Sequence, residues 1–399
     1  MTPSRECDFL IIGAGIIGLS LAHELRQRYP QASIMVVDKE RDVAAHASGR
    51  NSGVLHAGFY YSADSLKAKF CRDGNVLMKE YAQRKGLILN RCGKVVVAQN
   101  EREQGMVHEL ARRANVNGVA VEVVDEARLA EIEPNAKTHK EALYSPTTAT
   151  VDPLAVCHSL ASDLKEQGVA LLLGQRYERR LDGNKVSISG GAIRAGKIIN
   201  CAGLYADRIA KDFGFGAHFT IIPLKGVYIN YTGADIPIRT CIYPVPVPGS
   251  TSLGVHYGIR ADGTIRIGPT AIPAFWRENY QALSRFSASE AAAIMAWEAK
   301  LLVTNQNGFR ELAWSEIKKY WQPHMAAEAA KLVKHIDTRY FNQWSRPGIR
   351  AQLLDKRDLT MVQDFVVESD SHSAHVLNAV SPAFTSSFAF SRWLIDTHI

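Results

Sequence analysis

The chain has 399 residues, which is too long for a single hydrophobic core and predicts two domains of ordinary size. Hydrophobic residues make up 46% and charged residues 22%, as in ordinary globular proteins. The net charge of +7 is consistent with a solvated surface, with attraction of acidic substrates or with attraction to anionic lipid. The sequence contains no dense basic run interleaved with aromatic residues, so nucleic-acid binding is not expected. The sequence has no run of about 18 apolar residues, so we expect no membrane-spanning helix.

The N-terminus and the cysteines favour a reducing compartment. Asp8 interrupts the first apolar run and no small-residue cleavage site follows a basic start, so we expect no signal peptide. The six cysteines are scattered and form no CxxC pair, and the histidines are isolated, so neither a disulfide framework nor a metal site is indicated. These features predict a cytoplasmic protein.

A nucleotide-binding signature opens the chain. Residues 9–12 (FLII) predict a buried strand, 19–28 a helix with an apolar face, and 33–37 (SIMVV) a second strand. The GAGIIG turn between the first strand and the helix is a G-x-G-x-x-G pattern. The strands, the helix and the turn together predict a Rossmann-type βαβ unit.

Each residue of that turn has a physical reason. Gly13 permits the tight turn, Gly15 lets the backbone approach a pyrophosphate, and Gly18 lets the helix pack closely on the strand. The helix start, where Ile16 and Ile17 stand, offers N–H groups and partial positive charge to phosphates. These positions predict a site for the pyrophosphate of a dinucleotide.

Asp38 extends this site, and two further segments favour FAD over NAD. Asp38 ends the second strand, where a carboxylate binds a ribose hydroxyl pair and repels an NADP-like 2′-phosphate. Residues 48–61 (SGRNSGVLHAGFYY) form a donor-rich loop suited to an extended cofactor, and an NAD domain has no need of it. Residues 197–200 (KIIN) predict a strand that ends in a small-residue turn. The cofactor contacts expected here are Lys39, Ser48, Arg50, Asn51, Ser52, Gly53, Val54, Ala202 and Gly203.

Several segments in chain order resemble the glycine-oxidase-like group of FAD-dependent oxidoreductases, the D-amino-acid oxidase superfamily. More narrowly, they resemble L-2-hydroxyglutarate oxidases and dehydrogenases. The segments are 51–61 (NSGVLHAGFYY), 65–69 (SLKAK), 242–246 (IYPVP), 253–256 (LGVH), 348–352 (GIRAQ), 364–365 (DF), 378–383 (NAVSPA) and 385–387 (TSS). The resemblance therefore spans nearly the whole chain.

The resemblance implies an α/β fold with an α+β second domain. A Rossmann-type FAD-binding domain would comprise residues 1–90, 151–216 and 338–399. A discontinuous, mixed-sheet substrate domain would comprise residues 91–150 and 217–337. Within this layout, the patterns predict a helix after Asp64 as N-cap and strands at residues 93–98, 226–231, 239–243 and 263–268.

The implied activity is oxidation of L-2-hydroxyglutarate to 2-oxoglutarate by hydride transfer to flavin N5, with electrons leaving to quinone or oxygen. His56 is the candidate base, because a neutral imidazole accepts a proton near pH 7. His256 is a second candidate. Arg350 suits a substrate carboxylate, which a guanidinium binds bidentately. Further candidates for substrate contacts are Lys225, Tyr243, Tyr60 and Tyr61.

The C-terminal segment predicts a helix aimed at the flavin. Ser381 and Pro382 introduce a turn, and residues 383–396 read as a helix that begins at Ala383. Thr385 and Ser386 crowd its first turn. A helix N-terminus directed at flavin N1 and O2 would stabilise the anionic reduced ring.

Rival functions stay open at this point. An amino-acid or amine oxidase of the same superfamily would use the same fold, as would a glycerol-phosphate oxidase. A non-catalytic FAD-binding protein is a rival of another class. Residues 314–321 (WSEIKKYW) could form a basic, aromatic surface helix that contacts the inner face of a membrane peripherally, or simply a packed helix.

Overall fold

The computed structural model describes residues 4–235, 237–246, 254–379 and 381–399. Leu253 and Val380, which belong to the segments 253–256 and 378–383 named above, lie outside these ranges. The chain divides into two compact units. Unit 1 comprises Met1–Asn51, Pro153–Pro223 and Arg350–Ile399, and unit 2 comprises Ser52–Asp152 and Leu224–Ile349.

Unit 1 is built on an eight-stranded sheet. The core strands β1 (Ser4–Ile12), β2 (Ile34–Asp38), β9 (Ala170–Leu173) and β12 (Gly191–Asn200) are parallel. They are extended by β10 (Tyr177–Arg180), β11 (Lys185–Ile188), β22 (Val366–Ser369) and β23 (Ser373–Asn378). Because β23 pairs parallel with the end of β12, which itself pairs with β1, a C-terminal strand joins the same sheet as strands from the start and the middle of the chain.

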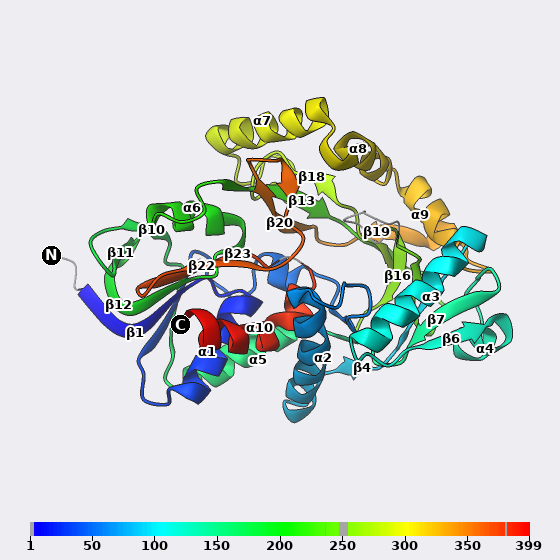
Figure 1. The fold of residues 1–399 in the computed structure, drawn as a ribbon, viewed down its shortest axis with the longest axis horizontal. Coiled ribbons are helices and arrows are strands. Elements are labelled where there is room, and N and C mark those ends of the chain that lie inside the picture. The colour runs from blue at the N-terminus through cyan, green and yellow to red at the C-terminus, as the bar shows by residue number, and fades with distance from the viewer. Residues whose placement is uncertain (1–3, 236, 247–253, 380) are drawn as a thin grey trace. The chain divides into compact units, whose positions relative to one another are not determined.

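Three helices of unit 1 pack together: α1 (Ile16–Arg28), α5 (Pro153–Glu166) and α10 (Ala383–His398) (Figure 1). The first ten residues of α1 are all buried, which explains why its sequence is apolar on more than one face. Glu24 on α1 pairs with Arg392 on α10 at 3.0 Å. The helix α6 (Ala206–Asp212) packs on β12 and β23.

Unit 2 holds a mixed eight-stranded sheet in the order β19-β14-β17-β16-β15-β5-β7-β6. The pair β15–β5 is parallel, and the other pairs in this sheet are antiparallel. The bounds are β5 (Lys94–Val97), β6 (Glu122–Asp125), β7 (Glu141–Ser145), β14 (Ile229–Tyr231), β15 (Cys241–Pro244), β16 (His256–Ile259), β17 (Ile265–Gly268) and β19 (Phe341–Trp344).

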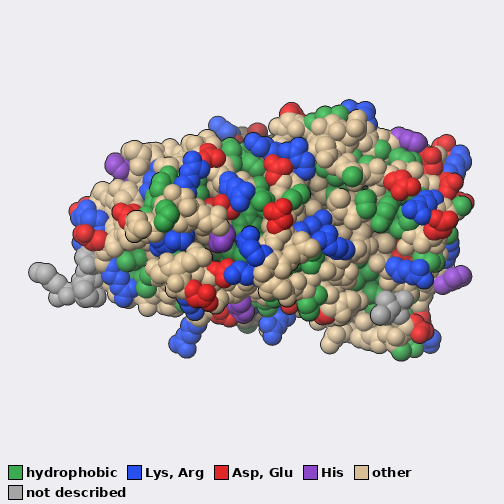
Figure 2. Space-filling view, turned by 90° about the horizontal axis from the view of Figure 1, so that it is seen from below, with side chains coloured by type: hydrophobic (Ala, Val, Ile, Leu, Met, Phe, Trp, Pro, Cys, Tyr) green, Lys and Arg blue, Asp and Glu red, His purple; other side chains and the backbone are tan. Residues whose placement is uncertain are grey.

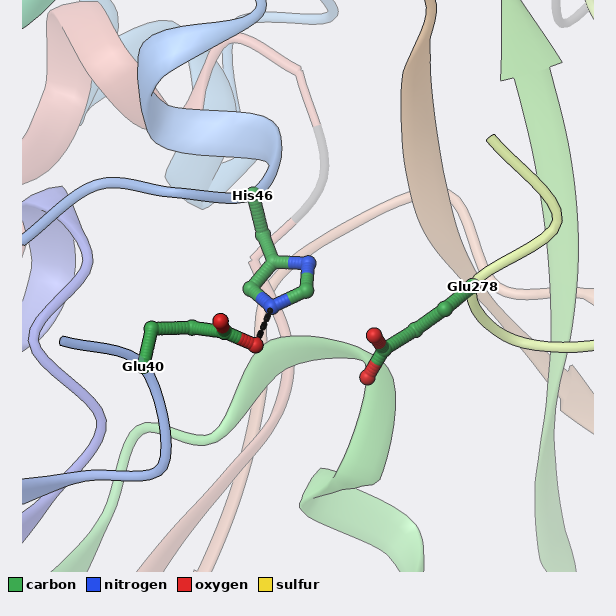
Figure 3. Close-up of side chains that lie close together, drawn as sticks. All are labelled: Glu40, His46 and Glu278. Carbon is green, nitrogen blue, oxygen red and sulfur yellow. Dashed lines mark hydrogen bonds and ion pairs between the residues drawn. The ribbon is translucent and has the colours of Figure 1, made fainter. Parts of the chain in front are cut away.

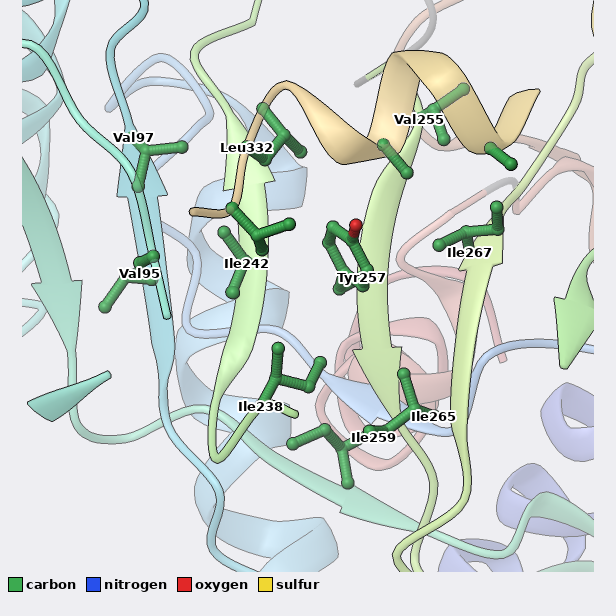
Figure 4. Packing of buried hydrophobic residues seen from close by; sticks show 14 of the residues in the cluster. Val95, Val97, Ile238, Ile242, Val255, Tyr257, Ile259, Ile265, Ile267 and Leu332 are labelled. Atoms are coloured by element: carbon green, nitrogen blue, oxygen red, sulfur yellow. The ribbon is translucent and has the colours of Figure 1, made fainter. Parts of the chain in front are cut away.

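The two faces of this sheet differ in chemistry. One face is apolar and is covered by α9 (Gln322–Ala330), as Figure 4 shows for Val95, Ile242 and Tyr257. Strand alternation sends the intervening side chains to the other face. There Val96 and Tyr243 belong to a second cluster with residues of α3 (Glu101–Val116).

Smaller elements complete the two units. A three-stranded sheet joins β3 (Val54–Leu55), β8 (Ala149–Val151) and β4 (Leu89–Asn90), and β18 (Ile272–Pro273) pairs with β13 (Phe219–Gly226). The strand β20 (Gly348–Asp355) pairs with β21 (Thr360–Met361). The remaining helices are α2 (Leu66–Arg84), α4 (Glu126–Ile132), α7 (Ala288–Thr304) and α8 (Phe309–Lys318).

All four predicted domain breaks differ from the observed ones, and so does the cap of one helix. Residues 52–90, assigned above to the FAD domain, belong to unit 2, because β3 and β4 both pair with β8. The later breaks fall at 152/153, 223/224 and 349/350 rather than 150/151, 216/217 and 337/338. The last two lie inside β13 and β20. The helix α2 is capped by Ser65, whose hydroxyl accepts the Ala68 N–H, and not by Asp64.

One strand prediction was also wrong. Residues 226–231 are not one strand, because β13 ends at Gly226 and β14 begins at Ile229. The backbone N–H of Val227, between them, donates instead to the Thr270 hydroxyl.

None of the helices in the described ranges is long and apolar enough to cross a membrane. On the face drawn in Figure 2, basic side chains are interspersed with acidic ones.

Candidate active site

The turn between β1 and α1 is too tight for any residue but glycine at two positions. Gly13 has φ +114°, and a Cβ there would lie 2.4 Å from the carbonyl oxygen of Cys201. A Cβ on Gly18 would lie 1.9 Å from the Gly13 carbonyl oxygen. The glycine pattern therefore lets the turn, the helix and the end of β12 approach one another.

The same contact brings two predicted cofactor segments together. Cys201 directly follows β12, and its N–H donates to the Ile12 carbonyl at 2.8 Å. Ala202 and Gly203 come next, and Gly203 adopts φ +54°. The turn at 202–203 thus lies beside the turn at Gly13, although nearly 190 residues separate them.

Asp38 and Ser48 hold the turn from the other side. The Asp38 carboxylate accepts the N–H of Ala14 at 2.7 Å and the N–H of Glu40 at 2.8 Å. The Ser48 hydroxyl accepts the N–H of Ile16, the first residue of α1, at 2.8 Å. A carboxylate has about four acceptor positions, so Asp38 can brace this turn and still accept ribose hydroxyls.

The loop after β2 is held by its own side chains. Lys39 Nζ lies 2.7 Å from Glu40 Oε1 and 3.2 Å from His46 Nε2, and His46 Nε2 lies 2.9 Å from the same Glu40 oxygen (Figure 3). Arg50 Nε donates to the Ala45 carbonyl at 2.8 Å, and Asn51 Nδ2 donates to the Ser48 carbonyl at 2.6 Å. Glu278, also drawn in Figure 3, belongs to unit 2, where it pairs with Arg285.

The start of α10 contains buried hydroxyls. Thr385, Ser386 and Ser387 are almost inaccessible to solvent, and the Ser386 N–H donates to the Pro382 carbonyl at 3.0 Å. The hydroxyls of Ser386 and Ser387 have no hydrogen-bond partner among the described residues. Buried polar atoms are usually paired, so unpaired ones beside a helix start suit a ligand.

These observations fit FAD. The glycine turn, the start of α1 and Asp38 provide the donors, close approach and acceptor that an adenosine diphosphate moiety requires. The turn at Gly203 is adjacent to the glycine turn. The start of α10, with Ser381 and Ala383, provides a second helix N-terminus within unit 1. Which of the predicted residues contact the cofactor stays a prediction.

In unit 2, the structure brings together three predicted catalytic residues with one that the sequence analysis missed. His56 Nδ1 lies 3.4 Å from the ammonium nitrogen of Lys94, on β5. The Lys94 Nζ lies 4.1 Å from the centroid of the Tyr243 ring and 5.3 Å from that of Tyr60. Lys94 could have been singled out, because it begins the apolar strand KVVV.

The same sheet face continues to His256. Its ring stacks on Tyr243 with centroids 3.7 Å apart and 20° between the planes, and its Nδ1 lies 2.9 Å from the Gly254 carbonyl. Burial raises the pKa of Tyr243 and of Tyr60 well above 10, so both phenols stay protonated at neutral pH. The Tyr60 hydroxyl has no partner within the described part of the chain.

The backbone around His56 is anchored to α2. The side-chain amide of Asn75 donates to the carbonyls of Leu55 and His56 at 3.0 and 3.1 Å, and the Cys71 thiol lies 3.3 Å from the His56 carbonyl. These contacts fix the main chain while the imidazole meets Lys94. His56 is buried, with 9% of its surface exposed.

Ser52, Gly53 and Val54 lie in unit 2 and are held by backbone contacts. The Ser52 hydroxyl accepts the Val54 N–H at 3.3 Å, and the Gly53 carbonyl accepts the Val151 N–H at 3.0 Å. Arg266 on β17, which the sequence analysis also missed, donates to the Ser52 carbonyl. Its position between Ile265 and Ile267 in a buried strand was the available signal.

Two cation candidates lie elsewhere. Lys225 Nζ lies 3.3 Å from Asn279 Oδ1, and burial lowers its pKa. Arg350 stands on β20 in unit 1 and is half-buried. The described contacts do not join either residue to His56, so their roles as carboxylate ligands stay predictions.

The chain belongs to the FAD-dependent oxidoreductase family, whose model matches residues 8–397. Among curated proteins, it is 35% identical over 413 aligned residues to the mitochondrial L-2-hydroxyglutarate dehydrogenase of Homo sapiens, covering 98% of this chain and 88% of that protein. It is 33% identical over 398 residues to the L-2-hydroxyglutarate dehydrogenase of Escherichia coli (strain UMN026 / ExPEC), covering 98% and 92%.

Solved structures confirm the predicted fold. The FAD-bound L-α-glycerophosphate oxidase of Mycoplasma pneumoniae matches with a TM-score of 0.74 at 20% identity, covering 98% of this chain and 94% of that chain. The glycine oxidase of Geobacillus kaustophilus matches with a TM-score of 0.69 at 17% identity and the same coverages. The predicted superfamily, enzyme class and FAD cofactor are therefore confirmed.

Proposed function

We propose that the protein oxidises L-2-hydroxyglutarate to 2-oxoglutarate. Relatives bearing the name L-2-hydroxyglutarate dehydrogenase align with 98% of the chain at 33–35% identity, which supports this substrate. The observation that carries the chemistry is the buried contact of His56 with Lys94 on the aromatic face of the unit 2 sheet. It places a buried imidazole, a group that can take a proton from a hydroxyl, beside a titratable amine.

The roles follow from the side-chain chemistry. His56 takes the hydroxyl proton, while His256, Tyr243 and Tyr60 shape the site on the same sheet face. Arg350 or Lys225 binds a substrate carboxylate. FAD, when bound, accepts the hydride at N5, so the substrate loses two electrons and two hydrogens.

Anaerobic reduction of the bound flavin tests the substrate. L-2-Hydroxyglutarate should bleach the flavin, whereas its D enantiomer, glycine, sarcosine and glycerol 3-phosphate should not. Bleaching by an amine alone would instead make the protein an amine oxidase, and bleaching by none would favour a non-catalytic FAD protein. His56→Ala should retain FAD and reduce it at least about a hundredfold more slowly, and an unchanged rate would remove His56 from the mechanism.

The electron acceptor is either quinone or oxygen. Substrate-reduced enzyme can be mixed with air-saturated buffer or with an anaerobic ubiquinone analogue, and the return of flavin absorbance followed. Fast return with the quinone alone would identify a dehydrogenase, and fast return with oxygen an oxidase. In both cases the acceptor would take the same two electrons from the reduced flavin.

We further propose that the segment around residues 314–321, together with the exposed apolar residues that precede it, contacts a membrane peripherally. The segment includes the end of α8, which Figure 1 shows next to α7. Most exposed large apolar side chains of the described residues fall between 275 and 321, a pattern that marks interaction surfaces. They are Phe275, Leu283, Phe286, Met295, Leu302, Val303, Trp314, Ile317, Tyr320 and Trp321. Co-sedimentation with phosphatidylglycerol vesicles should weaken in the double variant Trp314→Gln, Trp321→Gln but not in the control Trp344→Gln.

A cytoplasmic location is also proposed. All six cysteines are free thiols, which suits a reducing compartment. Several relatives are named mitochondrial proteins. Fractionation of the source cells, with the membrane pellet washed at high salt, would test both the compartment and the peripheral contact.

A further inference from the structure

Lys94 is a cationic residue in the core of unit 2. Its side chain is fully buried at the start of β5, and its Nζ faces the rings of Tyr243, Tyr60 and Phe59 at 4.1, 5.3 and 5.8 Å. Ring faces attract a cation, but they do not replace its lost water. Burial accordingly lowers the pKa of Lys94 to about 8.

Among the described residues, the charged and titratable groups that act on Lys94 include no carboxylate. Cys71 on α2, Cys92 before β5 and Cys241 on β15 act on it electrostatically. Within the described residues no acid forms an ion pair with it, and its hydrogen-bond partner is His56 Nδ1 at 3.4 Å. Three further charged or titratable groups act on the neighbours of Lys94 and not on Lys94 itself. Lys67 acts on Cys71, Arg266 acts on Cys241 and Tyr243, and Tyr228 acts on Tyr243.

The protonation state of Lys94 dictates the tautomer of His56. An ammonium has only donors, so charged Lys94 requires Nδ1 of His56 to accept, and the neutral imidazole then carries its proton on Nε2. In that state Nε2 cannot act as a base. A neutral Lys94 amine can accept from Nδ1–H, which leaves Nε2 able to take a proton from substrate.

We propose that Lys94 is the positioning residue that makes His56 a base, and that it receives the relayed proton. The substrate O–H proton passes to His56 Nε2, and the Nδ1 proton passes to the Lys94 amine. Bound FAD would supply the acceptor for the hydride. Lys94 ends as an ammonium between aromatic rings, and the imidazole stays neutral. This inference rests on the proposed role of His56 as the base.

The tautomer can be measured without substrate. In ¹⁵N-histidine-labelled holoenzyme, His56 is assigned as the imidazole signal that Lys79→Met keeps and His56→Gln loses. We expect its proton on Nε2 at about pH 7 and on Nδ1 at about pH 9.5, because Lys94 deprotonates near pH 8. The same tautomer at both pH values would overturn the proposal.

The rate of anaerobic flavin reduction tests the relay in turnover. In the wild type this rate should rise as the pH passes about 8, and Lys94→Met should abolish the rise and lower the rate at alkaline pH about tenfold or more. Lys79→Met is the matched control: burial also lowers its pKa to about 8, but its ammonium contacts the Thr147 carbonyl, not His56. Its pH profile should match the wild type.

Two further variants separate the relay from a simple charge. Lys94→Arg keeps a cation that does not deprotonate, so it should stay slow at every pH; a wild-type profile would overturn the relay. In Lys94→Ala, added ethylamine should restore part of the rate, whereas a structural cation would give no such rescue. A raised KM with an unchanged pH profile in Lys94→Met would make Lys94 a carboxylate ligand instead.

Failure of this inference differs from failure of the proposed function. If L-2-hydroxyglutarate does not bleach wild-type flavin, the substrate assignment fails, yet the tautomer measurement still reports on Lys94 and His56. If bleaching occurs and Lys94→Met retains the wild-type profile, only the relay fails. Flavin absorbance of each variant establishes that it is folded and loaded.

Discussion

Lys94→Met should change how stability depends on pH. The pKa of Lys94 is about 8 in the folded protein against an ordinary value of 10.5, because burial strips water from the ammonium. Below about pH 8 both the folded and unfolded states hold the proton, and the folded state bears the cost of burying it. Between these pKa values only the unfolded state holds it, so the unfolding free energy rises with pH.

The size of this effect follows from the two pKa values. Their difference corresponds to about 3 kcal/mol over the full range, and to about 2 kcal/mol between pH 7 and 9.5. Methionine is similar in volume and does not titrate, so the variant lacks this rise. The difference at any one pH also includes the lost His56 hydrogen bond and ring contacts. Its change with pH reports the titration of residue 94.

Denaturant unfolding of both proteins at about pH 7, 8.5 and 9.5, followed by far-UV circular dichroism, measures this change. The wild type should gain about 2 kcal/mol relative to Lys94→Met across the series. Other lysines and tyrosines titrate in both proteins and cancel in the comparison. A constant difference would show that Lys94 titrates alike in the folded and unfolded states, and would refute the reasoning.

Three further substitutions test the fold around the site. Gly13→Ala should lose FAD and at least about 2 kcal/mol of stability, because its φ is +114° and the Cys201 backbone leaves no room for a Cβ. The control Gly105→Ala, at an exposed position in α3, should keep FAD and stability. Gel filtration and thermal melting measure both. Burial raises the pKa of the Glu298 carboxyl to about 8, so between pH 4.5 and 8 only the folded state keeps this proton, and the stability of the wild type should fall as the pH rises. Glu298→Gln should remove this fall. Identical curves of melting temperature against pH for the two proteins would contradict the expectation. Ser65→Ala should cost about 1 kcal/mol as the α2 cap, with Asp64→Ala near zero, and equal effects would refute the cap.

Local sequence determined the elements at the cofactor end of the fold. The strand, turn and helix around Gly13, Gly15 and Gly18 were predicted because apolar runs, glycines and helical spacing act over a few residues. The strand that ends at Asn200 and the C-terminal helix from Ala383 were predicted for the same reason. The resemblance along the chain then supplied the superfamily and FAD, which the family match confirmed.

The grouping of segments was decided by tertiary structure. Residues 52–90 join unit 2 because short strands of two residues each pair with β8, and such pairing leaves almost no local signal. The boundary inside β13 has a similar cause, since a continuous strand passes through it. Composition and periodicity report which residues are buried, but they do not report against which partner.

The sequence by itself nominated His56, and only the tertiary structure supplied its partner. His56 stands in a glycine-rich loop that family resemblance makes prominent, whereas Lys94 begins an apolar strand and resembles a strand end at the surface. Their meeting depends on the packing of that loop onto the sheet face that carries Val96 and Tyr243. Such contacts arise from side chains far apart in the chain, so the chemistry of the site became visible only once the sheet was assembled.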